Sequence, residues 1–403
     1  MTGRRTNRRS LLRSAAALPA LGILASSKGD AAARVGGGGR DVIRELGVRP
    51  FINGGGAYTV LTASLMHRNV WEAMTVASRQ FCPLKDLHDA VGERIAELTK
   101  NEAALVSAGA ASAVAIGTAA CVAGKDTEKI RRLPDTRGMK NEVIIQKSHR
   151  NGYNHAARNT GIRLVEVETA EELESAIHSR TAMMLFLNMY KYDGKISYEE
   201  FAQLGKKHNV PTLVDAADAL PPVENLWDYT GVGFDLAAFS GGKGIMGPQS
   251  AGILVGRKDL IEAGRLNSSP YSDSVCRISK VNKEEIVGMM VALEEFVNRD
   301  HEAVWRGWEA QCDRIAGYVK GLPGVKTETI AKKLYSAVPH LHISWDYEAT
   351  GKKPADVVKE LREGSPSIEV SPNSGKELII AVWMLEPGED RIIGQRVKQI
   401  LTS

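Results

Sequence analysis

Short apolar runs alternate with amphipathic segments between residues 86 and 256. The apolar runs predict buried strands at Ala103–Ser107, Val143–Gln146, Ile162–Val167, Ala182–Asn188, Pro211–Asp215, Phe234–Phe239 and Gly252–Val255. The intervening segments have apolar residues at helical spacing and predict helices at Asp86–Lys100, Ala110–Ala123, Asn151–Asn159, Glu171–Ser179 and Tyr198–His208. This alternation is typical of an α/β fold with a mostly parallel sheet and helices on both faces. Ligands bind beyond the carboxyl ends of the strands in such sheets, so we expect the functional site there.

The pattern changes beyond residue 280. One long segment predicts a single helix from Val281 to about Lys320. Strands and helices of mixed order are then predicted at Val325–Ile330, Pro339–Trp345, Pro354–Glu363, Ser367–Val370, Glu377–Val382 and Gly388–Leu401. We interpret Trp345 and Trp383 as packing residues, because buried aromatic side chains usually belong to a core. The sequence therefore predicts a linker and N-terminal arm at 34–60, a large α/β domain at 61–265 and a smaller α+β domain at 266–403.

The first 33 residues differ in composition from the rest. Two arginine pairs, at positions 4–5 and 8–9, precede an Ala/Leu-rich stretch from residue 15 to 25 and a run of small residues. This order is typical of a signal peptide of the twin-arginine type, and the apolar stretch is well short of the ~20 residues that span a bilayer. We expect residues 1–33 to direct export to the periplasm. The protein stays in the cytoplasm if this signal is not used.

Charge and composition limit the classes of function that are compatible with this sequence. The full chain has a net charge of +4, and removal of residues 1–33, which carry a net +5, leaves a mature chain near −1. This balance lacks the basic excess that marks nucleic-acid binding. No membrane span is evident, and the four cysteines form no Cys-x-x-Cys pair, so no metal site is predicted and disulfide pairing stays open. The chain has the composition of a soluble globular enzyme.

We expect a reporter protein fused behind residues 1–40 to be exported to the periplasm. The reason is the ordered sequence of basic, apolar and small residues in this segment. Cell fractionation followed by a reporter assay measures the outcome. A reporter that remains in the cytosol contradicts the predicted export.

A lysine among small residues is the strongest chemical signal. Lys243 lies in Ser240–Gly244, directly after a predicted strand. An amine attacks a carbonyl only when it is unprotonated, and partial desolvation favours that form. Lys243 is therefore a candidate to form an imine with an aldehyde cofactor, with glycines that leave room for a bulky ring and with Ser240 near its phosphate. The alternative is a solvated lysine in a glycine turn.

A carboxylate precedes this lysine at the end of another predicted strand. Asp215 stands 28 residues before Lys243. At a strand end it could pair with a pyridine nitrogen and keep that nitrogen protonated, which makes the ring an electron sink. The alternative for Asp215 is a helix cap. Asp218 is the weaker candidate, because the strand has ended before it.

Two further segments follow predicted strands. The residues Gly109, Ala110 and Ala111 open a helix whose free N–H groups could hold a phosphate, although an ordinary tight corner has the same pattern. His149 is the first ring after the strand at 143–146. It could stack on the face of a cofactor, or it could be a solvated loop residue.

Taken in order, these residues resemble those of the fold-type I pyridoxal-phosphate enzymes. The run Lys243–Gln249 is similar to the selenocysteine synthase and D-glucosaminate-6-phosphate ammonia-lyase group, and so are Asn53–Leu61 and Arg277–Glu285. The match extends from about residue 43 to the C-terminus. Departures at Gly55–Ala57 and on both sides of Arg277 leave the substrate open.

This resemblance implies pyridoxal 5'-phosphate as the cofactor. Lys243 would be the imine lysine, Asp215 the partner of the pyridinium and His149 the stacking residue. The phosphate would bind at Ser240 and at the loop of Gly109, Ala110 and Ala111. Arg277 and Tyr58 would bind the substrate, and Arg277 suits a carboxylate because its guanidinium can make two parallel hydrogen bonds. The resemblance also implies at least a homodimer.

The same resemblance implies a lyase of the elimination or ammonia-lyase type that acts on a small amino acid or amino-sugar acid. The alternatives are a selenocysteine synthase-like transferase that acts on seryl-tRNA and an exported binding protein without turnover. A near-neutral mature chain and the expected export both favour a small-molecule substrate over a nucleic acid.

Overall fold

The computed structural model describes residues 40–331 and 338–403, so the predicted signal peptide at 1–33 lies outside the described residues. Two compact units divide the chain, Met1–Val48 and Arg49–Ser403. The described part of the first unit holds only the short helix α1, Val42–Glu45, which Asp41 caps. All elements below belong to the second unit. No helix among the described residues has the length and apolar character needed to cross a bilayer.

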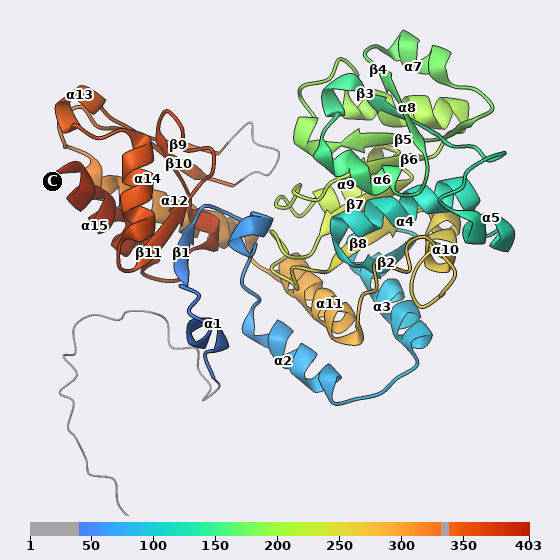
Figure 1. Cartoon of the computed structure of the whole chain (residues 1–403), viewed down its shortest axis with the longest axis horizontal. Coiled ribbons are helices and arrows are strands. Elements are labelled where there is room, and N and C mark those ends of the chain that lie inside the picture. The colour runs from blue at the N-terminus through green and yellow to red at the C-terminus, as the bar shows by residue number, and fades with distance from the viewer. Residues whose placement is uncertain (1–39, 332–337) are drawn as a thin grey trace, which may run out of the picture. The chain divides into compact units, whose positions relative to one another are not determined.

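Seven strands form the main sheet (Figure 1). Their order is β2 (Ala103–Ser107), β8 (Gly252–Gly256), β7 (Leu236–Ser240), β6 (Thr212–Asp215), β5 (Thr181–Leu187), β3 (Glu142–Gln146) and β4 (Arg163–Val167). All pairs are parallel except those that β8 makes with β2 and β7. The predicted α/β class with a mostly parallel sheet is confirmed, and six of the seven strands present their carboxyl ends at one edge.

Alternation along each strand fills two cores, one on each face of the sheet. Ile144 packs into the core under α2 (Arg68–Ser78), α3 (Leu84–Thr99), α7 (Ala170–Ala176), α8 (Tyr198–His208), α9 (Asn225–Val232) and α11 (Lys283–Asn298). Its neighbours Val143 and Ile145 pack into the core under α4 (Gly109–Ala123), α5 (Thr127–Arg132), α6 (His155–Arg158) and α10 (Lys258–Leu266). Burial on both faces explains why these strands are apolar runs rather than alternating sequences.

A third core belongs to the C-terminal part of the chain. Here β12 (Leu378–Ala381), β10 (His340–Ser344) and β9 (Lys326–Ile330) form an antiparallel sheet. The strand β1 (Phe51–Gly54) pairs in parallel with β11 (Ser367–Val370), as Figure 1 shows in blue and red. The helices of this part are α12 (His301–Val319), α13 (Tyr347–Thr350), α14 (Pro354–Glu363) and α15 (Glu389–Leu401).

The single helix predicted from Val281 to Lys320 is wrong. The chain instead forms α11 and α12, with Arg299 in an extended conformation between them. Asp300 caps α12 by accepting a hydrogen bond from the backbone N–H of Ala303 at 2.8 Å. The helix α11 packs into the sheet core and α12 into the C-terminal core, so the break lies where the chain passes from one core to the other.

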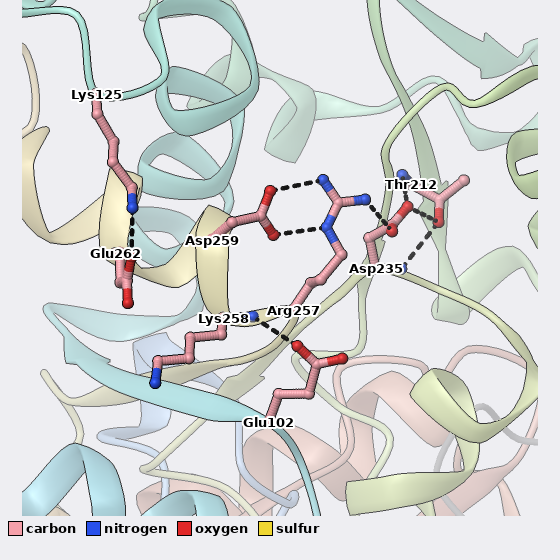
Figure 2. Close-up of polar contacts among 8 residues, drawn as sticks. All are labelled: Glu102, Lys125, Thr212, Asp235, Arg257, Lys258, Asp259 and Glu262. Atoms are coloured by element: carbon pink, nitrogen blue, oxygen red, sulfur yellow. Dashed lines mark hydrogen bonds and ion pairs between the residues drawn. The ribbon is translucent and has the colours of Figure 1, made fainter.

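A polar network closes the edge of the main sheet opposite to the carboxyl ends (Figure 2). Arg257, which follows β8, binds Asp235 and Asp259, each at 2.7 Å. Asp235 in turn accepts hydrogen bonds from the backbone N–H and the hydroxyl of Thr212, at 2.8 and 3.1 Å. Glu102 accepts one from the backbone N–H of Lys258 at 3.0 Å. These contacts fix the starts of β2, β6 and β7. The polar groups at this edge are thus paired with one another, and the carboxyl ends of the parallel strands lie at the opposite edge.

Candidate active site

A cavity of about 360 Å³ lies where several strands of the main sheet end. Leu187, Asp215 and Ser240 are the last residues of β5, β6 and β7, and all three line it. The other lining residues used below are Gly55, Gly56, Ala57, Tyr58, Gly109, Ala110, Ala111, Tyr153, Asp218, Lys243, His340, His342, Ser371, Asn373, Ile379 and Trp383. A larger hollow of about 640 Å³ lies at the opposite edge, beside Arg257 and Asp235, which already pair with each other. The reactive groups gather in the smaller cavity, so we place the site there.

The half-buried Lys243 lines this cavity from a tight turn after β7. The backbone N–H of Gly247 donates to the carbonyl of Gly241 at 2.8 Å and closes the turn. A side chain at Gly242 would place its Cβ 2.5 Å from Cα of Gln249, and one at Gly244 would come within 2.3 Å of the carbonyl oxygen of Leu220. The two glycines are therefore required for close backbone packing, and not to leave room for a ring as we expected.

Two carboxyl groups share the cavity with Lys243. The pKa of Asp215 is raised to about 6, chiefly by burial and also by the charge of Asp218, whereas the backbone N–H of Ala217 and the amine of Lys243 act to lower it. Burial also raises the pKa of Asp218, while Lys243 and a hydrogen bond from the side chain of Asn188 lower it. Asn188 is held by the hydroxyl of Tyr229 at 2.6 Å. Lys243 is thus the cation that offsets both carboxyls, and Asp218 belongs to the site although the sequence made it the weaker candidate.

The first turn of α4 forms another part of the lining. Gly109, Ala110 and Ala111 line the cavity, and no side chain caps this end of the helix. Gly109 has a φ of +79°, a conformation that glycine adopts without strain. The hydroxyl of Ser107 donates to the carbonyl of Gly109 at 2.9 Å and steadies the corner. Free N–H groups and the helix dipole make this a suitable place for a phosphate, with Ser240 beside it on the lining.

His149 lies just after β3, as predicted, and is not the solvated loop residue of the alternative. Its ring is fully buried and is not among the described residues that line the cavity. Its Nδ1 accepts a hydrogen bond from the backbone N–H of Leu187 at 3.1 Å, and its Nε2 donates to the carbonyl of Tyr190 at 3.1 Å. Burial lowers its pKa to about 4, so the ring is neutral. These hydrogen bonds make His149 a support for the end of β5, and its stacking on a cofactor stays a prediction. The exposed Tyr153, four residues later, does line the cavity.

The two residues predicted to bind the substrate, Tyr58 and Arg277, differ in their position relative to the cavity. Tyr58 lines the cavity, and its hydroxyl accepts a hydrogen bond from the side-chain amide of Asn373 at 3.3 Å. Arg277 is half-buried in the loop after α10 and is not among the described lining residues of this protomer. Its role in carboxylate binding stays a prediction.

The C-terminal part adds lining residues that the sequence reasoning missed. They are His340, His342, Ser371, Asn373, Ile379 and Trp383. The one available signal was the spacing of the two histidines, which places them on the same face of a strand. Trp345 is a packing residue as predicted, whereas Trp383 both packs in the C-terminal core and lines the cavity.

Comparison with known proteins identifies the family. Residues 58–304 match the family model described as "SelA: L-seryl-tRNA selenium transferase". A 5'-C-glycyluridine monooxygenase-decarboxylase of Streptomyces is 30% identical over 81% of this chain and 82% of its own length. The chain belongs to this family. Its predicted membership in the selenocysteine synthase and ammonia-lyase group is confirmed.

Other similarities favour the lyase branch of the family. The D-glucosaminate-6-phosphate ammonia lyase of Salmonella typhimurium is 27% identical over 89% of this chain and 98% of its own length. A solved structure of a D-glucosaminate-6-phosphate ammonia-lyase superposes with a TM-score of 0.79 at 25% identity, covering 90% of this chain and 98% of that one. The L-seryl-tRNA(Sec) selenium transferase of Aquifex aeolicus, by contrast, matches only 44% of each chain.

The predicted fold-type I class is confirmed. A serine palmitoyltransferase structure with a pyridoxal-phosphate internal aldimine superposes at a TM-score of 0.56 and 15% identity, over 87% of each chain, a likeness of fold alone. Family membership implies pyridoxal phosphate as the cofactor, and the residues present fit it. They supply an amine at Lys243, a carboxyl at Asp215 and an uncapped helix end at Gly109, all on one cavity.

We expect the affinity of the cofactor-free protein for pyridoxal phosphate to fall as the pH drops below about 6. Above that pH the carboxyl of Asp215 is ionised and can pair with a protonated ring nitrogen, and below it the carboxyl is neutral. The loss approaches about tenfold per pH unit. Titrations followed by cofactor fluorescence measure it.

Asp215→Asn is the matched control, because the amide keeps the size of the side chain and does not titrate. Its affinity should be low at every pH and should lack the step that wild-type protein shows. The same pH profile in both proteins would contradict the assignment of Asp215.

Proposed function

We propose that the protein is a pyridoxal-phosphate-dependent lyase that releases ammonia from a small amino acid with a sugar-derived skeleton. The observation that carries this proposal is the gathering of Lys243, Asp215 and the free N-terminus of α4 on one cavity. Similarity over 89% of the chain to an ammonia lyase supports the reaction type. Both long relatives have names that join an amino acid to a sugar or nucleoside, which supports the substrate class.

Each residue has a distinct task in this reaction. The cofactor supplies an electron sink for the negative charge that develops at the substrate Cα. Lys243 would hold the cofactor by its amine and would be the base that takes the proton from the substrate Cα. Asp215 pairs with the ring nitrogen and keeps it protonated. The N–H groups of Gly109, Ala110 and Ala111, with Ser240, hold the phosphate.

Asp218 supports the proton transfer by Lys243, with which it shares the cavity. Its carboxyl and the amine interact electrostatically, as the lowering of the Asp218 pKa by Lys243 shows. A carboxylate at this place stabilises the ammonium that Lys243 becomes after it has taken the proton. The hydrogen bonds that link Asp218 to Asn188 and Asn188 to Tyr229 keep the carboxyl in position.

The alternative function within this family is that of a transferase that acts on seryl-tRNA. The selenium transferase of Aquifex aeolicus matches less than half of this chain, whereas the ammonia lyase matches most of it. The near-neutral charge expected for the mature chain also favours a small molecule. A tRNA-binding titration of the mature protein separates the two functions, and ammonia release excludes a binding protein without turnover.

We expect the purified protein to release ammonia and a keto acid from hydroxylated amino acids such as D-glucosaminate. After the proton of Cα is removed, the β-hydroxyl leaves as water, and hydrolysis of the resulting enamine gives the keto acid and ammonia. Lys243→Ala should lower kcat by about 10³-fold or more, because the proton of Cα then lacks its base. A coupled ammonia assay over a set of D- and L-amino acids measures this.

Lys140→Ala is the control, since Lys140 is exposed and does not line the cavity. It should leave kcat unchanged. Release of no ammonia from any amino acid, or equal rates for the Lys243 and Lys140 variants, would overturn the lyase.

We also propose that the protein works as a homodimer. Apolar side chains are exposed between residues 60 and 81, at Val60, Leu65, Trp71, Val76 and Phe81. Exposed apolar groups of this size in a single segment mark an interaction surface, and a second copy of the chain is the partner that the family suggests. Sedimentation should give about twice the 43.7 kDa of one chain. Trp71→Glu together with Phe81→Glu should shift it to one chain, and a wild-type monomer would contradict the proposal.

A further inference from the structure

One wall of the cavity comes from the antiparallel sheet of the C-terminal part. His340 and His342 lie two residues apart on β10, so their side chains share a face. Ile379 of β12 pairs with His342 and lines the cavity on the same face. Leu341 and Ile343, which alternate with the two histidines along β10, point into the C-terminal core. The histidines are therefore presented to the cavity by the pleat of this sheet.

The hydrogen bonds of His340 fix which of its nitrogens can bind a ligand. Its Nδ1 lies 3.1 Å from the carbonyl oxygen of Val338. A carbonyl oxygen only accepts, so Nδ1 carries the proton and donates it. Burial lowers the pKa of His340, and the charge of His342 lowers it further, so the ring is neutral. Nε2 then has a free lone pair, which accepts a hydrogen bond.

The ring of His342 is oriented in the same way as that of His340, by a hydrogen bond at Nδ1. Its Nδ1 lies 2.8 Å from Oε1 of Glu377 and donates to that carboxylate. With Nδ1 engaged by Glu377, Nε2 is the nitrogen of His342 that remains for a ligand. The Glu377 carboxylate stands directly behind this histidine and disfavours a second anion in front of it.

Trp383 provides an unused donor on the same cavity. The side chain is only 8% exposed, and its Nε1 has no hydrogen-bond partner among the described residues. A Cβ built on Gly56 would lie 3.3 Å from this nitrogen, which places the indole N–H against the glycine turn at Gly55 and Gly56. Asn53 holds that turn by accepting from both glycine N–H groups, at 3.0 and 3.1 Å. A buried donor without a partner costs about 1–3 kcal/mol, so a ligand acceptor is expected here.

We propose that His340, His342 and Trp383 bind the end of the substrate remote from its amino group, and that this end is uncharged and hydroxylated rather than phosphorylated. A hydroxyl group both donates and accepts, so hydroxyls satisfy the lone pair of His340 and the indole N–H of Trp383 together. An ionised phosphate only accepts, so it would leave the lone pair of His340 without a donor, and its charge would be repelled by the Glu377 carboxylate. This inference rests on the proposed function and specifies its substrate class.

Binding of unreactive ligands to the cofactor-loaded enzyme tests the proposal. D-gluconate and 6-phosphogluconate have the carbon skeleton of an amino-sugar acid but no amine, so neither is turned over. Isothermal titration calorimetry gives the Kd of each. We expect 6-phosphogluconate to bind no more tightly than D-gluconate. Tenfold tighter binding of the phosphorylated compound would overturn the proposal.

Substitutions assign the effect to the residues. Trp383→Phe keeps the aromatic ring but removes the donor and should raise the Kd for D-gluconate about tenfold. Trp345→Phe is the matched control, because Trp345 is equally buried in the same core and its Nε1 donates to the carbonyl of Lys352 at 2.8 Å. It should leave the Kd unchanged. His340→Phe, which removes the lone pair, should weaken binding in the same way as Trp383→Phe.

Two readouts keep this inference separate from the proposed function. Equal Kd values for wild type, Trp383→Phe and His340→Phe would overturn the inference, while ammonia release would still stand for the lyase. Conversely, loss of D-gluconate affinity in both variants supports the subsite. If the protein at the same time turns over no amino acid, only the proposed lyase activity is overturned.

Discussion

The electrostatic balance between one amine and two half-buried carboxyls is the constraint on which the site depends. Lys243 shares its cavity with Asp215 and Asp218, and burial raises the pKa of both acids. Without the lysine, two carboxylates of like charge would face each other in a partly dry cavity. The tight turn after β7 brings the amine to this place, and the glycines Gly242 and Gly244 allow that turn to pack.

The sheet explains how groups so far apart in the sequence meet. Parallel strands present their carboxyl ends at one edge, so Leu187, Asp215 and Ser240 line the same cavity. The opposite edge is tied by Arg257 and Asp235. The C-terminal part then contributes a wall of polar rings. The main sheet thus places an amine and carboxyls on the cavity, and we propose that the smaller sheet recognises the substrate.

The groups that were predictable from the sequence are those with a local signal. Lys243, Asp215 and Gly109 each follow an apolar run that reads as a strand, and the structure places all three on the cavity. His149 has the same kind of position in the sequence, but its ring turns inward to hydrogen-bond the end of β5. A local pattern locates a residue after a strand and does not determine which way its side chain points.

The rest depends on long-range contacts. The pairing of β1 with β11 joins residues more than 300 positions apart, and it brings the glycine turn at Gly56 to Trp383. No window of sequence reports such a contact, so the role of Trp383 beyond packing was missed. The break at Asp300 had a local signal, a capping residue within a helical pattern, but its cause is the passage of the chain between two cores.

A covalent bond between Lys243 and the cofactor is the central claim, and one measurement tests it directly. The protein purified with pyridoxal phosphate is treated with borohydride, digested and analysed by peptide mass spectrometry. We predict a phosphopyridoxyl group on Lys243. Its attachment to another lysine, or an unmodified Lys243 in protein that has bound the cofactor, would contradict this account of the site.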